Sequence, residues 1–249
     1  MPFLTGRTKA TRSLVFKSLE TYATKPIPTP PPTFEVPGQA EIHEGVEVYP
    51  LDGNDIVGDC TIAGMDHFFR AQAKLYNCKY SDPSTSALKS KYFHLTGGQD
   101  SGLNEEFVLN TFHKESFFGS KVEAFAPVST TSLLQWHQSI AFYGGLYLGI
   151  RCPESARRAF QKELETKTVV PWTYEGEETE DGHCVVALGY GPNGGLHCAT
   201  WGGIAVLTPS FLAHYLDEAW VILSSELVEA KGDTLGLNIE ALKEDISHI

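Results

Sequence analysis

Cys60 is the residue whose setting best suits nucleophilic chemistry. It follows a loop that ends in Gly58 and Asp59, and it opens the segment CTIAGMDHFFRA, in which apolar residues recur at helical spacing. We interpret Asp59 as the N-cap of a helix from Cys60 to about Tyr76. A thiol at a helix start lies beside free backbone N–H groups and the positive end of the helix dipole, and both favour the thiolate. The sequence therefore predicts a reactive thiol at Cys60.

His183 could supply the base that this thiol needs. The stretch from Gly182 to Gly203, GHCVVALGYGPNGGLHCATWGG, is predicted to form a strand, a tight turn and a second strand, with His183 at the start of the first. An imidazole accepts and returns a proton near neutral pH. A cysteine at a helix start and a histidine at a strand start, far apart in sequence, are the parts of a thiolate–imidazolium pair.

These stretches resemble the papain-like cysteine peptidases over roughly residues 48 to 225. After the catalytic histidine that family has Gly-Tyr-Gly and then Trp-Gly, which match Gly189-Tyr190-Gly191 and Trp201-Gly202 here. The resemblance points to a divergent branch found in bacterial and phage genomes.

The resemblance implies a role for each matching residue. Cys60 would attack a peptide carbonyl and His183 would transfer the proton. Asn54, six positions before Cys60, matches the family's glutamine and would donate an amide N–H to the oxyanion, together with the Cys60 N–H. Trp201 would shield the pair, with Gly58 and Asp59 supporting the loop.

The residue that orients the histidine differs from the family pattern. The family's asparagine falls on Ala199, which has no polar side chain. Thr200 is expected to point to the opposite face of the strand, so it is a poor substitute, and His197 is a speculative one. Asp181, in the acidic loop before His183, could stabilise an imidazolium, although solvated charges interact weakly. We therefore expect reduced activity.

The order of expected elements, helices first and strands later, predicts an α+β fold with two lobes and the site in the cleft between them. The helical lobe would span about 53–118, the β lobe, an antiparallel sheet or barrel, about 119–225, and a tail 226–249. Within the helical lobe, a glycine-rich loop at 97–102 would line the cleft. We expect helices at 60–76, 86–95, about 103–112, 131–142, 153–166 and from 209, and strands at 45–51, 121–128, 144–150, from 183 and at 219–223.

Residues 1–40 are predicted to form an arm with a proline-rich, extended leader, KPIPTPPPTFEVPG. The arm lacks the long helices of the papain-like prodomain, so blockage of the cleft by the arm is only a weak idea. It could instead contact protein assembly partners.

Composition limits the partners and the compartment. The chain has 31 acidic and 19 basic residues and a net charge of −12, which argues against a nucleic-acid-binding surface. No apolar run suits a membrane span, and the first ten residues lack a signal-peptide apolar region. Five cysteines without a CxxC pair argue against a zinc site and favour a reducing, cytoplasmic setting, or a virion if the protein is phage-encoded. Position 57, where the family has a disulfide cysteine, is Val57. The remaining cysteines are expected to be core or incidental residues: Cys78, Cys152, Cys184 and Cys198.

The expected function is that of a cysteine peptidase or amidase that acts on peptides by acyl transfer and needs no cofactor or metal. One alternative is a weakened or inactive papain-fold protein with a structural or accessory role, for example in a phage particle. Another is a small Cys–His peptidase of the cell-wall type, which the Gly-Tyr-Gly and Trp-Gly pattern disfavours.

Overall fold

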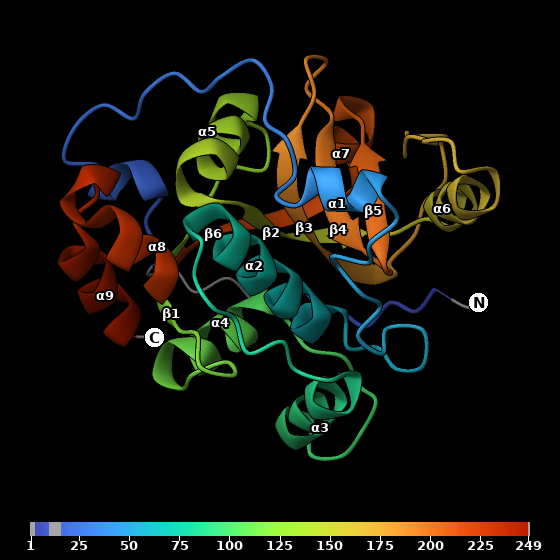
Figure 1. The fold of residues 1–249 in the computed structure, drawn as a ribbon, viewed down its shortest axis with the longest axis horizontal. Coiled ribbons are helices and arrows are strands. Elements are labelled where there is room, and N and C mark those ends of the chain that lie inside the picture. The colour runs from blue at the N-terminus through green and yellow to red at the C-terminus, as the bar shows by residue number, and fades with distance from the viewer. Residues whose placement is uncertain (1–2, 10–15, 249) are drawn as a thin grey trace.

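The computed structural model describes residues 3–9 and 16–248 and contains a six-stranded antiparallel sheet surrounded by helices (Figure 1). The α-helices are α1 (Gln39–His43), α2 (Cys60–Tyr76), α3 (Thr85–Leu95), α4 (Glu105–Lys114), α5 (Leu133–Tyr143), α6 (Glu154–Thr166), α7 (Pro209–Tyr215), α8 (Ser225–Lys231) and α9 (Ile239–Ser247). The strands are β1 (Val122–Pro127), β2 (Leu146–Arg151), β3 (Gly182–Tyr190), β4 (Leu196–Thr200), β5 (Gly203–Leu207) and β6 (Leu216–Ser224). Short 3-10 helices lie at Leu19–Tyr22 (η1) and Gly232–Leu235 (η2).

The strand order in the sheet is β1-β6-β2-β3-β4-β5, and every pair is antiparallel. The connections β3–β4 and β4–β5 are hairpins, whereas β6 returns late in the chain to lie between β1 and β2. Strand β3 is buried along nearly its whole length. The result is the α+β fold expected from the sequence, with β3 inside the sheet.

Helix α2 is almost wholly buried and packs against β3. Gly64 makes this close approach possible, because a Cβ there would lie 3.0 Å from the Tyr147 ring and 3.1 Å from Cys184 Sγ. The helix ends at Asn77, which adopts the left-handed conformation that commonly terminates helices. Figure 1 shows α2 in front of the sheet, with α3 and α4 below it. The expected bounds of this helix, Cys60 to Tyr76, are confirmed.

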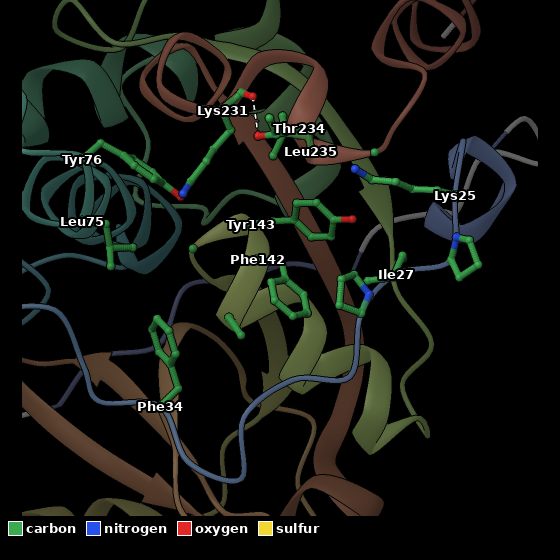
Figure 2. Close-up of a pocket in the computed structure, with 15 residues that line it drawn as sticks. Lys25, Ile27, Phe34, Leu75, Tyr76, Phe142, Tyr143, Lys231, Thr234 and Leu235 are labelled. Atoms are coloured by element: carbon green, nitrogen blue, oxygen red, sulfur yellow. Dashed lines mark hydrogen bonds between the residues drawn. The ribbon is translucent and has the colours of Figure 1, made fainter.

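The proline-rich leader runs along the outside of the fold as an extended segment. Phe34 and Tyr190 exchange backbone hydrogen bonds of 3.0 and 2.9 Å, and Gln138 on α5 donates to the carbonyls of Ile27 and Pro28. The leader, α5 and the α8–η2 segment enclose a hollow of about 320 Å³, lined in part by Lys25 and Lys231 (Figure 2). No cysteine or histidine lines this hollow, so the chemistry expected from the sequence lies elsewhere.

One predicted element is absent from the structure, and two observed elements were not predicted. Residues 45–51 form a turn, a bend and irregular backbone, so the expected strand there is wrong. Strand β5 and helix α8 were not anticipated. The division into two lobes near residue 118 stays a prediction.

Among the described residues, no helix combines the length and apolar character needed to cross a membrane.

Candidate active site

Cys60 is the first residue of α2, and its side chain is buried against β3. The backbone N–H groups of Cys184 and Gly6 lie close enough to the thiol to favour its ionised form. Burial nevertheless raises the pKa of the Cys60 thiol to about 12, because the loss of water outweighs the help that these N–H groups give the thiolate. In this arrangement the thiol is neutral, contrary to the expectation that the helix start would lower its pKa.

The Cys60 thiol lies beside the backbone of Cys184, and His183 directly precedes Cys184. Cys60 therefore lies at the start of β3, the part of the strand that carries His183. The imidazole stacks on Trp201, with ring centroids 4.3 Å apart, and its Nε2 lies 2.8 Å from Thr200 Oγ1. The other ring nitrogen, Nδ1, is buried and has no hydrogen-bond partner among the described residues. Burial lowers the pKa of His183 to about 3, and the positive charge of Arg157 adds to this effect. The imidazole is therefore neutral as well.

The rejection of Thr200 as the partner of His183 was wrong, and the strand register shows why. Ala199 pairs with Val186 across β3 and β4, so Thr200 falls opposite the next residue toward His183, Val185. Directly opposed residues share a face of the sheet, and so do residues two apart on one strand. Thr200 and His183 are therefore diagonal neighbours on one face, and Ala199 lies on the other.

The two other residues considered for this region lie away from the imidazole. His197 pairs with Gly189 and Val206, far along β4 from Thr200. Asp181 forms an exposed ion pair of 3.0 Å with Arg157. The hydroxyl of Thr200 is therefore the side-chain group that lies at hydrogen-bond distance from His183 Nε2.

The loop before Cys60 is held by backbone contacts more than by its side chains. The Asn54 side-chain amide donates to the Val57 carbonyl at 3.2 Å, and the Gly58 N–H donates to Asp100 at 2.9 Å. Asp59 occupies the N-cap position of α2, as expected, but its side chain makes no capping hydrogen bond. Its carboxylate is fully buried with neither oxygen paired, and burial raises the pKa of Asp59 to about 8. Donation by Asn54 to an oxyanion stays a prediction.

The start of the chain crosses the site. Within the segment Phe3–Thr8, the Leu4 N–H donates to the Asn54 carbonyl at 3.2 Å, and the Leu4 carbonyl accepts from Trp201 Nε1 at 3.0 Å. Phe3 stacks on Trp201 with centroids 4.9 Å apart. Trp201 thus lies between the rings of Phe3 and His183, and the segment covers the proposed nucleophile and base.

Glycines allow this segment to lie directly on the walls of the cleft. A Cβ at Gly6 would overlap the Gly58 carbonyl, and a Cβ at Gly102 would overlap the Gly6 carbonyl. A Cβ at Gly182 would likewise overlap the Arg7 carbonyl. Gly102 belongs to the glycine-rich loop that was expected to line the cleft; it contacts Gly6, and a substrate cleft along this loop stays a prediction. Gly97 and Gly98 of the same loop face open space.

The segment is anchored by a buried ion cluster. The Arg7 guanidinium pairs with Glu105 on α4 at 3.0 Å, with Asp217 on β6 at 2.9 Å, and with Glu218 on β6. The Arg7 side chain is only 1% exposed. This cluster was not anticipated, because Arg7 is more than 90 residues from each of its three partners and no motif links them.

The arm therefore behaves differently from the expectation. Residues 10–15 lie outside the described residues, but residues 3–8 occupy the cleft without the long helices of a prodomain. Gly6 and Arg7 were the sequence features that could have indicated this placement of the arm, and neither residue type is specific by itself.

Comparison with solved structures supports this description of the fold. The structure is similar to the crystal structure of xylellain, a cysteine protease from Xylella fastidiosa, with a TM-score of 0.62 at 15% sequence identity. The match covers 88% of this chain and 95% of the xylellain chain. No family model and no curated protein matches the sequence. The chain therefore has the papain-like α+β fold, in which a helix carrying Cys60 packs against an antiparallel sheet that carries His183.

Proposed function

We propose that this protein is a papain-like cysteine peptidase or amidase in which Cys60 is the nucleophile and His183 the general acid and base. The observation that carries the proposal is the difference between the two ring nitrogens of His183. One ring nitrogen is held by Thr200, whereas the buried Nδ1 has no hydrogen-bond partner among the described residues and can take up the thiol proton when Cys60 approaches it.

The reaction follows from these roles. Nε2 keeps its hydrogen and donates a hydrogen bond to Thr200. Nδ1 then accepts the thiol proton, and the Cys60 sulfur attacks the carbonyl carbon of the substrate. The Cys60 backbone N–H, with Asn54, would stabilise the oxyanion. His183 then gives its proton to the departing amine, which leaves a thioester on Cys60. Water attacks the thioester after losing a proton to His183, and the acid leaves as the thiol re-forms.

Activity requires the segment Phe3–Thr8 to leave the cleft, because a peptide cannot reach Cys60 past it. Its departure would also change the acid–base chemistry. Burial is the largest cause of the high pKa of Cys60 and of the low pKa of His183. Water entering the cleft would move both values toward the range in which the thiolate–imidazolium pair forms.

A digest of an unstructured protein substrate tests the proposal. The full chain and Gly6→Ala, which should loosen the segment, are incubated with reduced casein, and new peptide termini are identified by mass spectrometry. Cleavage that disappears in Cys60→Ala and in His183→Ala is the expected result. Cleavage that persists in Cys60→Ala would reject the proposed nucleophile.

One observation favours a non-catalytic alternative. The Arg7 anchor is buried and paired with three carboxylates, as suits a segment that never leaves. In that case the protein would have a structural or accessory role, and neither chain would cleave the substrate. A bacterial or phage origin, a cytoplasmic setting and assembly partners for the arm stay predictions.

A further inference from the structure

We propose that the acidic pocket filled by Arg7 is the specificity pocket of the enzyme and selects peptides with an arginine or lysine beside the scissile bond. This inference rests on the proposed peptidase function. It assigns to Glu105, Asp217 and Glu218 the role of binding a substrate cation once the segment Phe3–Thr8 has left.

The pocket lies where a substrate side chain would enter. Arg7 follows Gly6, whose N–H reaches the Cys60 thiol, and the Arg7 N–H donates to the Gly182 carbonyl at 3.0 Å. Leu103 forms 3.0 Å hydrogen bonds with residues on both sides of Arg7, donating to the Gly6 carbonyl and accepting from the Thr8 N–H. A substrate backbone in this cleft meets the same Gly182 and Leu103 groups. Its residue opposite Leu103 therefore directs its side chain into the pocket.

The pocket is shaped for a large planar cation. Gly149 on β2 leaves room for the guanidinium, since a Cβ there would overlap Arg7 Nε and would lie 2.7 Å from Glu105 Oε1. The Trp220 indole donates to Glu218 Oε2 at 3.0 Å, which leaves Oε1 directed at the cation. Helix α4 and strand β6 thus hold the acceptors in place, and Gly149 on β2 leaves space for the bound group.

The charge balance gives the pocket its selectivity. Arg151 lies 3.3 Å from the second oxygen of Asp217, so the other carboxylates depend on the cation that fills the pocket. Removing one partner of a buried ion pair leaves an uncompensated charge, which is strongly unfavourable. An apolar or acidic substrate side chain leaves Glu105 and Glu218 without a cationic partner, whereas an arginine or lysine supplies one. Charge-assisted hydrogen bonds of this kind are also stronger than neutral ones.

Paired fluorogenic peptides test the pocket directly. The peptides carry arginine, leucine or glutamate at the first or the second residue before the scissile bond and are otherwise identical. We expect the arginine peptide to exceed the leucine peptide in kcat/KM by about tenfold or more at one of the two positions, in the full chain and in Gly6→Ala. The glutamate peptide should be the poorest substrate.

A matched pair of variants separates the pocket from other causes. Glu218→Gln should reduce the arginine preference at least about fivefold, because the arginine peptide loses a charged partner and the leucine peptide no longer leaves the Glu218 charge uncompensated. Glu123→Gln, on β1 in an ion pair with Lys243, should leave the preference intact. Thermal unfolding checks that each variant is folded, and Asp217→Asn replaces Glu218→Gln if that chain does not fold.

The two proposals fail in different ways. Cys60-dependent hydrolysis with equal rates for arginine and leucine peptides at both positions would overturn the specificity pocket and leave the peptidase standing. An arginine preference that Glu218→Gln does not change would also overturn it. No hydrolysis of any peptide, together with a Cys60 that a peptide vinyl sulfone does not modify, would reject both.

Discussion

A threonine hydroxyl orients the proposed catalytic histidine of this protein. His183 Nε2 and Thr200 Oγ1 lie 2.8 Å apart, and stacking on Trp201 fixes the plane of the ring. A hydroxyl has a donor and two acceptor sites, so it can bond the imidazole in either protonation state. One short polar side chain and one aromatic ring therefore suffice to direct Nδ1.

Replacing Thr200 tests this orienting role. We expect Thr200→Val, which keeps the shape and removes the hydroxyl, to lower kcat by about tenfold to a hundredfold, because the general base loses its fixed direction. KM should change little. Thr200→Ser should retain most of the activity, since it keeps the hydroxyl. Equal kcat values for Thr200→Val and the unmodified chain would show that the contact is dispensable.

Ala199 is the position at which the sequence resemblance suggests an asparagine. Because Ala199 is fully buried on the face away from His183, Ala199→Asn would bury an amide without placing it near the imidazole. We expect no gain in turnover and a loss of about 1–3 kcal/mol in the free energy of unfolding. Urea denaturation measures the loss. A rise in turnover in the folded variant would contradict the strand register.

Asp59 links stability to pH. Its pKa is raised to about 8 by burial, so between the unfolded value of 3.8 and about 8 the folded state holds a proton that the unfolded state has lost. The contribution of Asp59 is thus fully present below pH 3.8 and is lost as pH rises through 8, with a slope of at most about 1.4 kcal/mol per pH unit.

Asp59→Asn removes this titration. We expect the difference in unfolding free energy between the variant and the unmodified chain to grow in favour of the variant from pH 5 to pH 8. Urea denaturation at several pH values measures it. A difference that stays constant across this range would show that Asp59 is ionised in the folded protein.

At the scale of chain segments and elements, the segment Phe3–Thr8 determines whether the site is open. Its backbone is hydrogen-bonded to Asn54, Gly182 and Leu103, which lie on three separate parts of the cleft. The close contacts of Gly6 with Gly58 and Gly102 leave no space for a side chain at this point. A single methyl group there should therefore displace the segment.

Gly6→Ala provides this methyl group. We expect iodoacetamide to modify Cys60 at least about tenfold faster in Gly6→Ala at pH 7, because the segment no longer covers the thiol and its pKa falls. Gly195→Ala is the matched control, since a Cβ there meets its nearest atoms at an ordinary 3.5 Å. Unchanged labelling in a folded Gly6→Ala chain would show that the segment does not limit access.

Local sequence patterns predicted the helices and strands well, but they did not predict the contacts between distant segments. The apolar spacing after Cys60 marks α2, and the apolar runs around the Pro-Asn-Gly-Gly turn mark β3 and β4. The face that Thr200 shares with His183 depends on the pairing register of two strands, which residue types alone do not specify. The Arg7 cluster depends on tertiary folding that joins the arm, α4 and β6.

At the scale of the whole molecule, one fold brings the start of the chain, the helix of Cys60 and the strand of His183 to a single cleft. The helix lies on the sheet, and the arm closes the cleft from outside. The buried, neutral state of Cys60 and His183 follows from this closure. The account predicts a latent thiol that becomes a nucleophile when the cleft opens.

Site-resolved thiol labelling tests this central claim most directly. A peptide vinyl sulfone with arginine beside the warhead is added at pH 7 to Gly6→Ala, with and without His183→Ala, and mass spectrometry locates the adduct among the five cysteines. The account predicts modification of Cys60 alone, lost when His183 is replaced or when the chain is unfolded first. Labelling of Cys60 that is equally fast without His183, or in the unfolded chain, would contradict it.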